Sequence, residues 1–183
     1  MAVDDIRVET DRLILPPPNA EDFEAWAAFQ KDAETMTYIG GVKSRAESWR
    51  VLCAMVGAWR VRGYAMFSVI LKESGQWIGR IGPWYPEGWP GREVGWAIAP
   101  DHAGKGFALE AAVASMDYAV DTLGWTDICH TIDPANLASI RLAQRLGSTN
   151  RGPTRLPEPF HDARVDDWGQ SRDQWIENRR KFQ

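Results

Sequence analysis

Cysteine is scarce in this sequence, with only two residues, Cys53 and Cys129, in a chain of 183. Neither belongs to a Cys-X-X-Cys pair or to a Cys/His spacing, so the sequence contains no zinc-ligand pattern and no disulfide framework. We therefore expect no metal site. Both cysteines lie in apolar surroundings, and we expect them to be buried thiols in a reducing compartment.

An excess of positive charge is also absent, because 21 Lys and Arg face 25 Asp and Glu, for a net charge of −4. Nucleic-acid-binding domains are normally basic, so direct binding of nucleic acid is not expected. No apolar run reaches transmembrane length, and the N-terminus, with Asp4, Asp5 and Glu9, lacks the basic-then-apolar order of a signal peptide. We expect a cytoplasmic protein that does not bind membranes.

The most informative stretch runs from Trp96 to Ala112, where an apolar strand ends, a turn carries Gly104 and Gly106, and a helical pattern begins. Such a turn gathers unpaired backbone N–H groups at the positive end of a helix dipole, which favours phosphate binding. Glycine lets a ligand approach the main chain closely, and Lys105 adds a positive charge. An ordinary strand–turn–helix junction has the same pattern, so this stretch alone leaves both interpretations open.

Strand and helix patterns alternate around this stretch. Three strands joined by short turns precede the glycine turn, and short turns favour antiparallel pairing. The expected helices begin near Asn19, Asp32, Ser44, Gly106, Asn136 and Ser171. The helix that Ser44 starts and Gly63 ends has an expected inward stripe of Trp49, Leu52, Cys53 and Val56. The expected strands are 12–15, 65–71, 77–84, 93–99, 127–132, 148–151 and 165–168.

This order of elements predicts an α/β (α+β) fold with a mixed, largely antiparallel sheet of about seven strands and helices on both faces. The strand before the glycine turn and the strand after its helix are expected to be parallel neighbours. Such sheets bind ligands beyond the carboxyl ends of their strands. No linker, repeat or low-complexity segment interrupts the chain, and we expect residues 1–183 to form a single domain.

Four pieces of the sequence are informative together because of their order and spacing. They are Glu9–Leu15, Glu93–Pro100, Ala103–Ala108 followed by Glu110-Ala111, and Asn136–Ser139 with Leu146-Gly147. In this order they resemble the GNAT superfamily of acyl-CoA-dependent N-acetyltransferases, and within it the ribosomal-protein N-terminal acetyltransferase (RimJ/RimL-like) branch. The third piece falls on the acyl-CoA signature (Q/R)-x-x-G-x-(G/A). The resemblance implies a GNAT-like fold with a sheet splayed in its middle, and acetyl-CoA as the cosubstrate.

The same resemblance implies where the cosubstrate lies. Backbone N–H groups of the glycine turn would hold the pyrophosphate, and the pantetheine arm would lie between the strand that ends at Ala99 and the strand from Asp127. A backbone N–H near Ile98 would serve the thioester carbonyl. The implied cofactor-binding residues are Ile98, Ala99, Ala103, Gly104, Lys105, Gly106, Phe107, Ala108, Asn136 and Ser139.

Two positions depart from the family pattern. The first residue of the signature is Ala103 instead of Gln or Arg, so we expect binding to rely on main-chain donors, with His102 or Lys105 replacing the missing polar group. Many relatives place a Tyr where this chain has Ala143, and that Tyr protonates the departing thiolate. Ser139, a water or direct release of the thiolate must serve here.

Glu93 and Ser139 are the candidate catalytic residues. The position of Glu93 resembles that of a carboxylate that some relatives use as a general base, acting through a water. The alternative is a carboxylate on a solvated strand face, paired with Arg92 or Arg80. Ser139 either contacts the cofactor near its sulfur or bonds back to its helix backbone. Asn136 is expected both to cap that helix and to hydrogen-bond the cofactor arm.

Histidine and aromatic residues supply further candidates. His130, on the expected fifth strand, is more typical of a hydrogen-bonded core residue than of a catalyst, while His161 would line the acceptor side from the tail. Trp84, Tyr85 and Trp89 would form one wall of the acceptor pocket. Nothing in these residues identifies the amine, so protein N-termini, polyamines, aminoglycosides and amino acids all remain open.

The expected activity is direct transfer of an acetyl group to a primary amine of a protein N-terminus or a small molecule, and a homodimer is compatible with it. A dinucleotide oxidoreductase needs its glycine loop after a first parallel strand, whereas three antiparallel strands precede this loop. A P-loop is excluded because Gly106, not Ser or Thr, follows Lys105. The remaining alternative is an acyl-CoA-binding regulatory or interaction module with little or no turnover.

Overall fold

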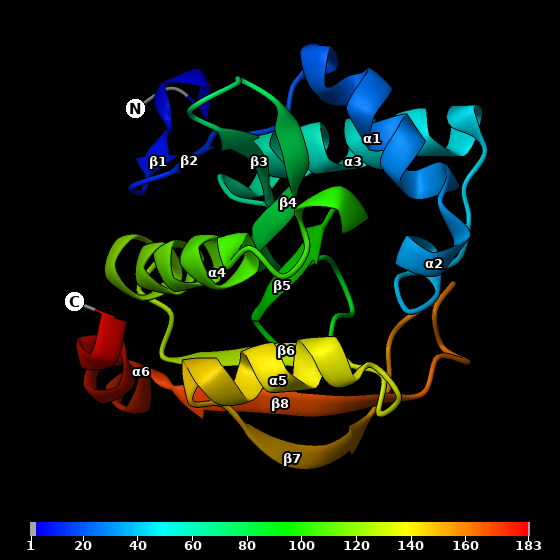
Figure 1. Cartoon of the computed structure of the whole chain (residues 1–183). Helices are drawn as coiled ribbons and strands as arrows, with labels where there is room; N and C mark the ends of the chain where they lie inside the picture. Colours follow the sequence, from blue (N-terminus) through cyan, green and yellow to red (C-terminus); the bar gives the residue numbers. More distant parts are fainter. Residues whose placement is uncertain (1–2, 183) are drawn as a thin grey trace.

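Eight strands form one mixed sheet in the computed structural model, which describes residues 3–182 (Figure 1). The strand order across the sheet is β1-β2-β3-β4-β5-β6-β8-β7, and every neighbouring pair is antiparallel except β5 and β6. The sheet therefore has one strand more than we expected. The strands are β1 (Val8–Glu9), β2 (Leu13–Leu15), β3 (Phe67–Leu71), β4 (Trp77–Trp84), β5 (Glu93–Ile98), β6 (Asp127–Ile132), β7 (Thr149–Thr154) and β8 (Val165–Ser171).

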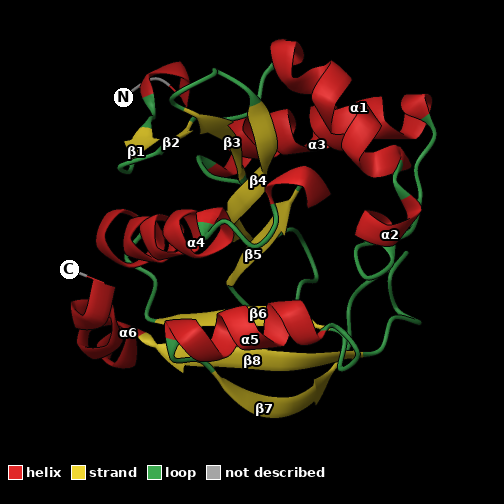
Figure 2. Ribbon diagram, viewed as in Figure 1, coloured by secondary structure: helices red, strands yellow, loops and turns green. Residues whose placement is uncertain are grey.

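Helices cover both faces of this sheet, as predicted. The fourth and fifth helices lie on the near side in Figure 2, whereas the third passes behind β3 and β4 and the first packs against the third. The helices are α1 (Phe23–Lys31), α2 (Ala33–Met36), α3 (Arg45–Arg62), α4 (Phe107–Asp117), α5 (Leu137–Leu146) and α6 (Arg172–Asn178). Short 3-10 segments span Val3–Asp5, Ala20–Asp22, Pro100–His102 and Arg179–Phe182, and a π turn, Tyr118–Thr122, extends α4.

Capping residues explain where the helices begin and end. Ser44 caps α3 in a reciprocal pair with Glu47, and Gly63 ends this helix in the left-handed region with φ 78°. The Asn136 side chain accepts the Ser139 N–H and so starts α5. Because these signals are local, the sequence places these helix ends where the structure has them.

The predicted inward stripe of α3 is wrong in part. The buried residues of this helix are Ser48, Leu52, Met55 and Trp59. The stripe is rotated because Trp59 enters the core, where its Nε1 donates to the Met66 carbonyl over 3.0 Å. Trp49 is instead 47% exposed, and Cys53 also lies at the surface, so only the other cysteine is a buried thiol.

Two apolar clusters fill the two halves of the molecule. One lies between β2–β4 and the α1–α3 pair, around Trp26, Trp59 and Phe67. The other lies between α4, α5 and β6, around Met116 and Ile128. No helix within residues 3–182 is both long and apolar enough to cross a membrane.

A single paired position, Glu93 with Cys129, joins β5 to β6 and so connects the two halves of the sheet. The two strands are parallel, which confirms the prediction. The pairing is closed by the Cys129 N–H, which donates to the Arg92 carbonyl over 2.9 Å. Beyond this point β5 pairs only with β4, as far as Ile98, so the sheet is splayed in its middle.

Candidate active site

The glycine turn between β5 and α4 is built from backbone conformations that favour glycine. Gly104 and Gly106 have φ of 73° and 83°, in the left-handed region. Gly106 is also the N-cap residue of α4, and no side chain caps the helix there. The start of α4 is therefore open to a ligand.

Six consecutive backbone N–H groups, from Gly104 to Leu109, have no acceptor within the described residues. The N–H groups before them are used, because Ala103 donates to the Pro100 carbonyl over 3.0 Å, and the first one after them, Glu110, donates to the Gly106 carbonyl over 3.1 Å. Six free donors at the positive end of a helix fit the pyrophosphate of CoA. The predicted donors Gly104 to Ala108 are thus brought together, whereas the Ala103 N–H is already bonded.

Arg12, just before β2, contacts this turn and is a further residue of the site that was not predicted from the sequence. Its Nη1 donates to the Lys105 carbonyl over 3.1 Å, and its guanidinium lies over the Phe107 ring, 4.4 Å from the centroid. Its Nε donates to Glu110 over 2.6 Å, and the same carboxylate accepts the Thr10 hydroxyl over 2.6 Å. The sequence does contain a signal for this ion pair, because Glu110 lies one turn into α4 and Arg12 lies just before β2.

Of the two side chains proposed to replace the missing Gln or Arg, Lys105 is bonded to the main chain of the turn and His102 is not. Ala103 is exposed, so its side chain leaves space above the loop. The Lys105 ammonium donates to the Asp101 carbonyl over 2.7 Å. The His102 Nδ1 is buried and has no partner in the described chain.

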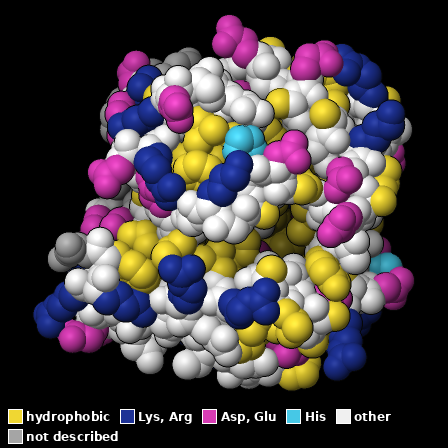
Figure 3. Space-filling view, viewed as in Figure 1, with side chains coloured by type: hydrophobic (Ala, Val, Ile, Leu, Met, Phe, Trp, Pro, Cys, Tyr) yellow, Lys and Arg dark blue, Asp and Glu magenta, His cyan; other side chains and the backbone are white. Residues whose placement is uncertain are grey.

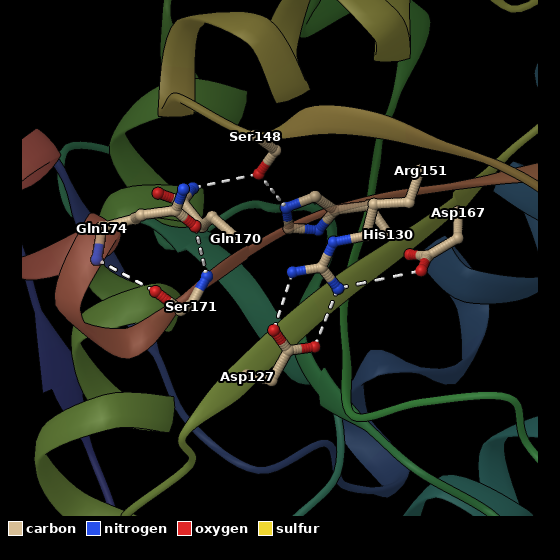
Figure 4. A network of polar contacts seen from close by, with 8 residues as sticks. All are labelled: Asp127, His130, Ser148, Arg151, Asp167, Gln170, Ser171 and Gln174. Atoms are coloured by element: carbon tan, nitrogen blue, oxygen red, sulfur yellow. Dashed lines mark hydrogen bonds and ion pairs between the residues drawn. The ribbon is translucent and has the colours of Figure 1, made fainter.

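His130 fills the base of the splay between β5 and β6 (Figure 4). Its Nδ1 lies 2.7 Å from the Val94 carbonyl and its Nε2 lies 3.0 Å from the Ser148 hydroxyl, which also accepts from Gln170 over 3.0 Å. These contacts fit a neutral ring that donates from Nδ1 and accepts at Nε2. Burial lowers the pKa of His130 to about 4. The expectation of a hydrogen-bonded core histidine is confirmed.

An ion-pair group beside His130 fixes the other half of the sheet (Figure 4). Arg151 on β7 donates to both carboxylate oxygens of Asp127 on β6, over 2.8 and 2.7 Å, and lies 3.7 Å from Asp167 on β8. The three strands are therefore linked by side chains as well as by their backbone ladder. This gives the splay one rigid wall.

A cavity of about 670 Å³ opens where the two halves meet. Figure 3 shows a hollow that separates the upper and lower parts of this face. Hydrophobic side chains lie at its bottom, and Lys and Arg side chains lie above and below it. Pockets of this volume hold small ligands. The cavity brings together the predicted site residues Glu93, Asn136 and Ser139 with Trp84, Trp89, Trp96 and Arg80.

Glu93 is buried, with 7% of its surface exposed, so it does not lie on a solvated face. Its Oε2 accepts the Trp89 indole N–H over 2.6 Å and the Thr131 hydroxyl over 2.8 Å. Its Oε1 has no hydrogen-bond donor in the described chain and lies beside Gly95, 3.2 Å from the place where a Cβ would sit. One oxygen is anchored and the other is available within the cavity.

Burial raises the pKa of Glu93 to about 7, although the hydrogen bonds from Thr131 and Trp89 and the charge of Arg80 act in the opposite direction. A carboxyl with this pKa is partly ionised near neutral pH. It therefore takes up and releases protons in the range where a general base operates.

Ser139 and Asn136 reach the cavity from the first turn of α5. The Ser139 hydroxyl does not bond back to its helix. It accepts the Trp96 indole N–H over 3.1 Å, which leaves its own hydrogen free to be donated. Ala143, one turn further on, is fully buried. Asn136 caps the helix as expected, and its side-chain amide has no acceptor in the described chain.

The two backbone N–H groups predicted to bind the cosubstrate near the end of β5, those of Ile98 and Ala99, differ in whether they are already hydrogen-bonded. The Ala99 N–H donates to the Ile78 carbonyl over 2.8 Å, so it is not available to a ligand. Successive N–H groups of a strand point to opposite sides, which directs that of Ile98 toward the splay. Of the two predicted positions, only Ile98 can supply a donor there.

The expected acceptor wall is formed only in part. Trp84 and Trp89 line the cavity, with ring centroids 6.3 Å apart. Tyr85 and His161 are absent from the lining. Tyr85 lies outside because Arg62 stacks over its ring at 5.6 Å, and His161 turns toward Glu158, 2.7 Å away. The segment between β7 and β8 lines the cavity through Phe160 and its neighbours. This segment has no helical or strand periodicity, so the sequence does not identify these residues.

Comparison with known proteins gives one consistent result. Residues 12–149 match the family described as Acetyltransferase (GNAT) domain. The protein named uncharacterized N-acetyltransferase p20, from Bacillus licheniformis, is 30% identical over 149 residues, which cover 80% of this chain and 84% of that protein.

Solved structures agree with these matches. An acetyltransferase from Agrobacterium tumefaciens str. C58 is 30% identical, with a TM-score of 0.80 over 90% of this chain and 94% of its own. The ribosomal-protein-S5-alanine acetyltransferase from Vibrio fischeri has a TM-score of 0.73 over 93% of this chain and 99% of its own. Its identity of 18% shows the likeness of fold alone.

Proposed function

Because this chain belongs to the GNAT family of N-acetyltransferases, we propose that it transfers acetyl groups from acetyl-CoA directly to a primary amine, on a peptide N-terminus or a small molecule. In this proposal Glu93 is the general base and Ser139 assists the leaving group. The observation that carries it is the buried carboxyl of Glu93, anchored through Oε2 and free at Oε1 inside the cavity.

The chain supplies the groups that would hold acetyl-CoA. The free N–H groups of Gly104 to Leu109 would bind its pyrophosphate. The Asn136 amide, which lines the cavity, and the Ile98 N–H, which strand alternation directs away from β4, would bind its arm. When bound, the thioester supplies an activated acetyl carbon. The Ile98 N–H would stabilise the negative charge that develops on the carbonyl oxygen.

Glu93 would manage the proton of the acceptor. The amine must lose a proton to expose its lone pair, and Glu93 Oε1 takes that proton directly or through one water. As the C–N bond forms and the C–S bond breaks, the Ser139 hydroxyl donates a hydrogen bond to the leaving sulfur. Once the C–N bond has formed, the nitrogen loses a second proton, which passes through water to the thiolate, and the proton first taken by Glu93 Oε1 is released to solvent. An ammonium acceptor thus gives the amide, the CoA thiol and one free proton.

Replacement of Glu93 by Gln tests this proposal, because Gln keeps the hydrogen bonds from Trp89 and Thr131 and removes the basic oxygen. We expect kcat near pH 7 to fall by about 10²–10⁴-fold, with partial recovery at higher pH as the free amine becomes abundant. CoA affinity should change little. Acetyl-CoA consumption against a panel of amines, measured across pH, provides the profiles.

Glu87→Gln is the matched control, because Glu87 lies six positions earlier and its side chain is fully exposed, at 100%. Superimposable profiles for wild type and Glu93→Gln would remove Glu93 as the base. CoA binding without consumption on any amine would instead favour a binding module with little or no turnover.

A further inference from the structure

Arg80 projects from β4 into the same cavity as Glu93. Arg80 pairs with Ala97 across the β4–β5 ladder, and Trp84 pairs with Glu93. Cross-strand partners share a face, and so do residues two or four apart along a strand, so Arg80 and Glu93 lie on one face of the sheet. Both residues line the cavity.

The Arg80 guanidinium has no carboxylate partner within the described residues. Its Nη1 contacts the Met66 sulfur at 3.2 Å, and its Nε is inaccessible to solvent and has no acceptor. The Trp26 ring lies 5.7 Å from its central carbon. Burial lowers the pKa of Arg80 to about 10, so the group is still a cation at neutral pH.

A half-buried cation whose Nε is closed to solvent and that makes no ion pair is costly, so its persistence in a ligand cavity points to a partner from outside the chain. Glu93 does not fill this role. Its Oε2 is taken by Trp89 and Thr131, and the two side chains form no ion pair.

Gln30 on α1 supplies a second unsatisfied group at this place. It lines the cavity and is only 2% exposed, and its Oε1 has no hydrogen-bond partner. Trp26, one turn earlier on the same helix, also has an unpartnered indole N–H. Two polar atoms of α1, an acceptor on Gln30 and a donor on Trp26, therefore remain unsatisfied, and buried polar groups are normally hydrogen-bonded.

We propose that Arg80 binds a carboxylate of the acceptor, so that the acceptor is a small molecule carrying both a primary amine and a carboxylate. This inference rests on the proposed function, since the amine of that molecule is placed at Glu93. The single charge of one guanidinium matches that of a carboxylate, and the Gln30 Oε1, an acceptor, would take an N–H or O–H donor of the same molecule. A protein N-terminus has an uncharged carbonyl next to its first residue and would leave Arg80 unpaired.

The test compares each of the twenty proteinogenic amino acids with its own carboxamide as acceptor, with acetyl-CoA consumption as the readout. The two members of a pair differ in the carboxylate alone. We expect kcat/KM of the wild type for the preferred acid to exceed that for its amide by about 100-fold or more, because a site built for a polar group rejects analogues that lack it.

Arg80→Met should remove this difference, mainly through a higher KM for the acid. It should also raise the melting temperature, because an unpaired buried charge is lost, whereas an arginine with a purely structural role would lower it. Gln30→Glu should abolish the preference too, because it places a competing carboxylate beside Arg80. Arg92→Met is the control, since Arg92 is an exposed neighbour outside the cavity lining and should leave the preference intact.

A second readout separates this inference from the proposed function. The melting temperature of the CoA complex is measured with each acid and each amide, in wild type and in Arg80→Met. Stabilisation by acids that needs Arg80 supports carboxylate binding, even if no amine is acetylated and the proposed function fails. Acetylation of acids and amides at equal rates would overturn the inference and leave the proposed function standing. Neither acetylation nor acid-dependent stabilisation would reject both.

Discussion

The two parts of the proposed site differ in which groups they offer. At the glycine turn, the proposed CoA end, the groups that would face the ligand belong to the main chain, six N–H donors from Gly104 to Leu109. At the acceptor end they are side chains, Glu93 and Arg80 from neighbouring strands and Gln30 from a helix. A main-chain site follows from one continuous segment, whereas a side-chain site needs the whole sheet to be in place.

This difference predicts how each end fails. The CoA end should be sensitive to the backbone geometry of the turn and tolerant of most side-chain changes. The acceptor end should respond to single side-chain substitutions while the fold stays intact.

Gly106→Val should raise the Kd for CoA by about 1,000-fold, which corresponds to a loss of about 4 kcal/mol of binding free energy. Gly106 has φ 83°, where a branched residue is strained, and its new Cβ would lie 3.3 Å from the Arg12 guanidinium. Calorimetry with CoA measures the loss. Gly75→Val is the matched control, because Gly75 has φ 71° in a remote turn with no atom within 4 Å of the added Cβ. Unchanged affinity in Gly106→Val would remove the glycine turn as the phosphate site.

Glu93→Gln should change the dependence of stability on pH. The pKa of Glu93 is raised from 4.5 to about 7 in the folded chain, so its ionisation opposes folding, and stability is lost as the pH rises through this range. The gain in unfolding free energy of the variant over wild type should grow by about 3 kcal/mol between pH 4.5 and 8. Urea unfolding at both pH values measures it, and a constant difference would show that Glu93 ionises as freely as in water.

The sequence predicts the glycine turn and the helix caps well and the surroundings of Glu93 poorly, for a physical reason. Glycine turns and helix caps are local, so Gly104, Gly106 and Asn136 were identified from a few neighbouring residues. The burial of Glu93 depends on Trp89 and Thr131, which come from a loop and a different strand. No local sequence pattern predicts these contacts, so the sequence alone leaves a solvated carboxylate as the alternative.

The same limit explains errors elsewhere in the fold. Helical periodicity shows that α3 has an apolar side, but several residues around the helix are apolar. Packing against α1 and β3 selects Met55 and Trp59, and leaves Trp49 at the border, where it contacts the Phe23 ring at 5.0 Å. The unpaired state of Arg80 could not be predicted either, because it depends on the position of every carboxylate in the folded chain.

Trp89→Phe should raise the pKa that Glu93 shows in the rate profile. The lost indole N–H donates to the ionised carboxylate, and such a bond contributes about 1.5–3 kcal/mol, or about one to two pKa units. The rising limb of kcat/KM should therefore move from about pH 7 to higher pH, with CoA affinity unchanged. Trp84→Phe is the control, because Trp84 lines the same wall without bonding to Glu93. A limb that stays in place would show that another group titrates.

Ala103→Arg should tighten CoA binding by one added charge-assisted hydrogen bond, at most about 1.5–3 kcal/mol. The lower end of this range is expected, because Ala103 is exposed and solvent weakens the contact. Calorimetry against Ala103→Met separates the charge from added bulk. Weaker binding in the Arg variant would show that His102 already occupies this space.

The free N–H groups of the glycine turn also bear on how this enzyme can diversify. Mutation replaces side chains and leaves peptide groups in place, so a main-chain site for the acetyl donor would be inherited through long divergence. A chain with Ala103 in place of the family's Gln or Arg would then keep its CoA site. Recognition of the amine has no such protection. One nucleotide change at the codon for Arg80 or Gln30 would offer the same donor to a different acceptor, which makes new substrates a short evolutionary step on an unchanged scaffold.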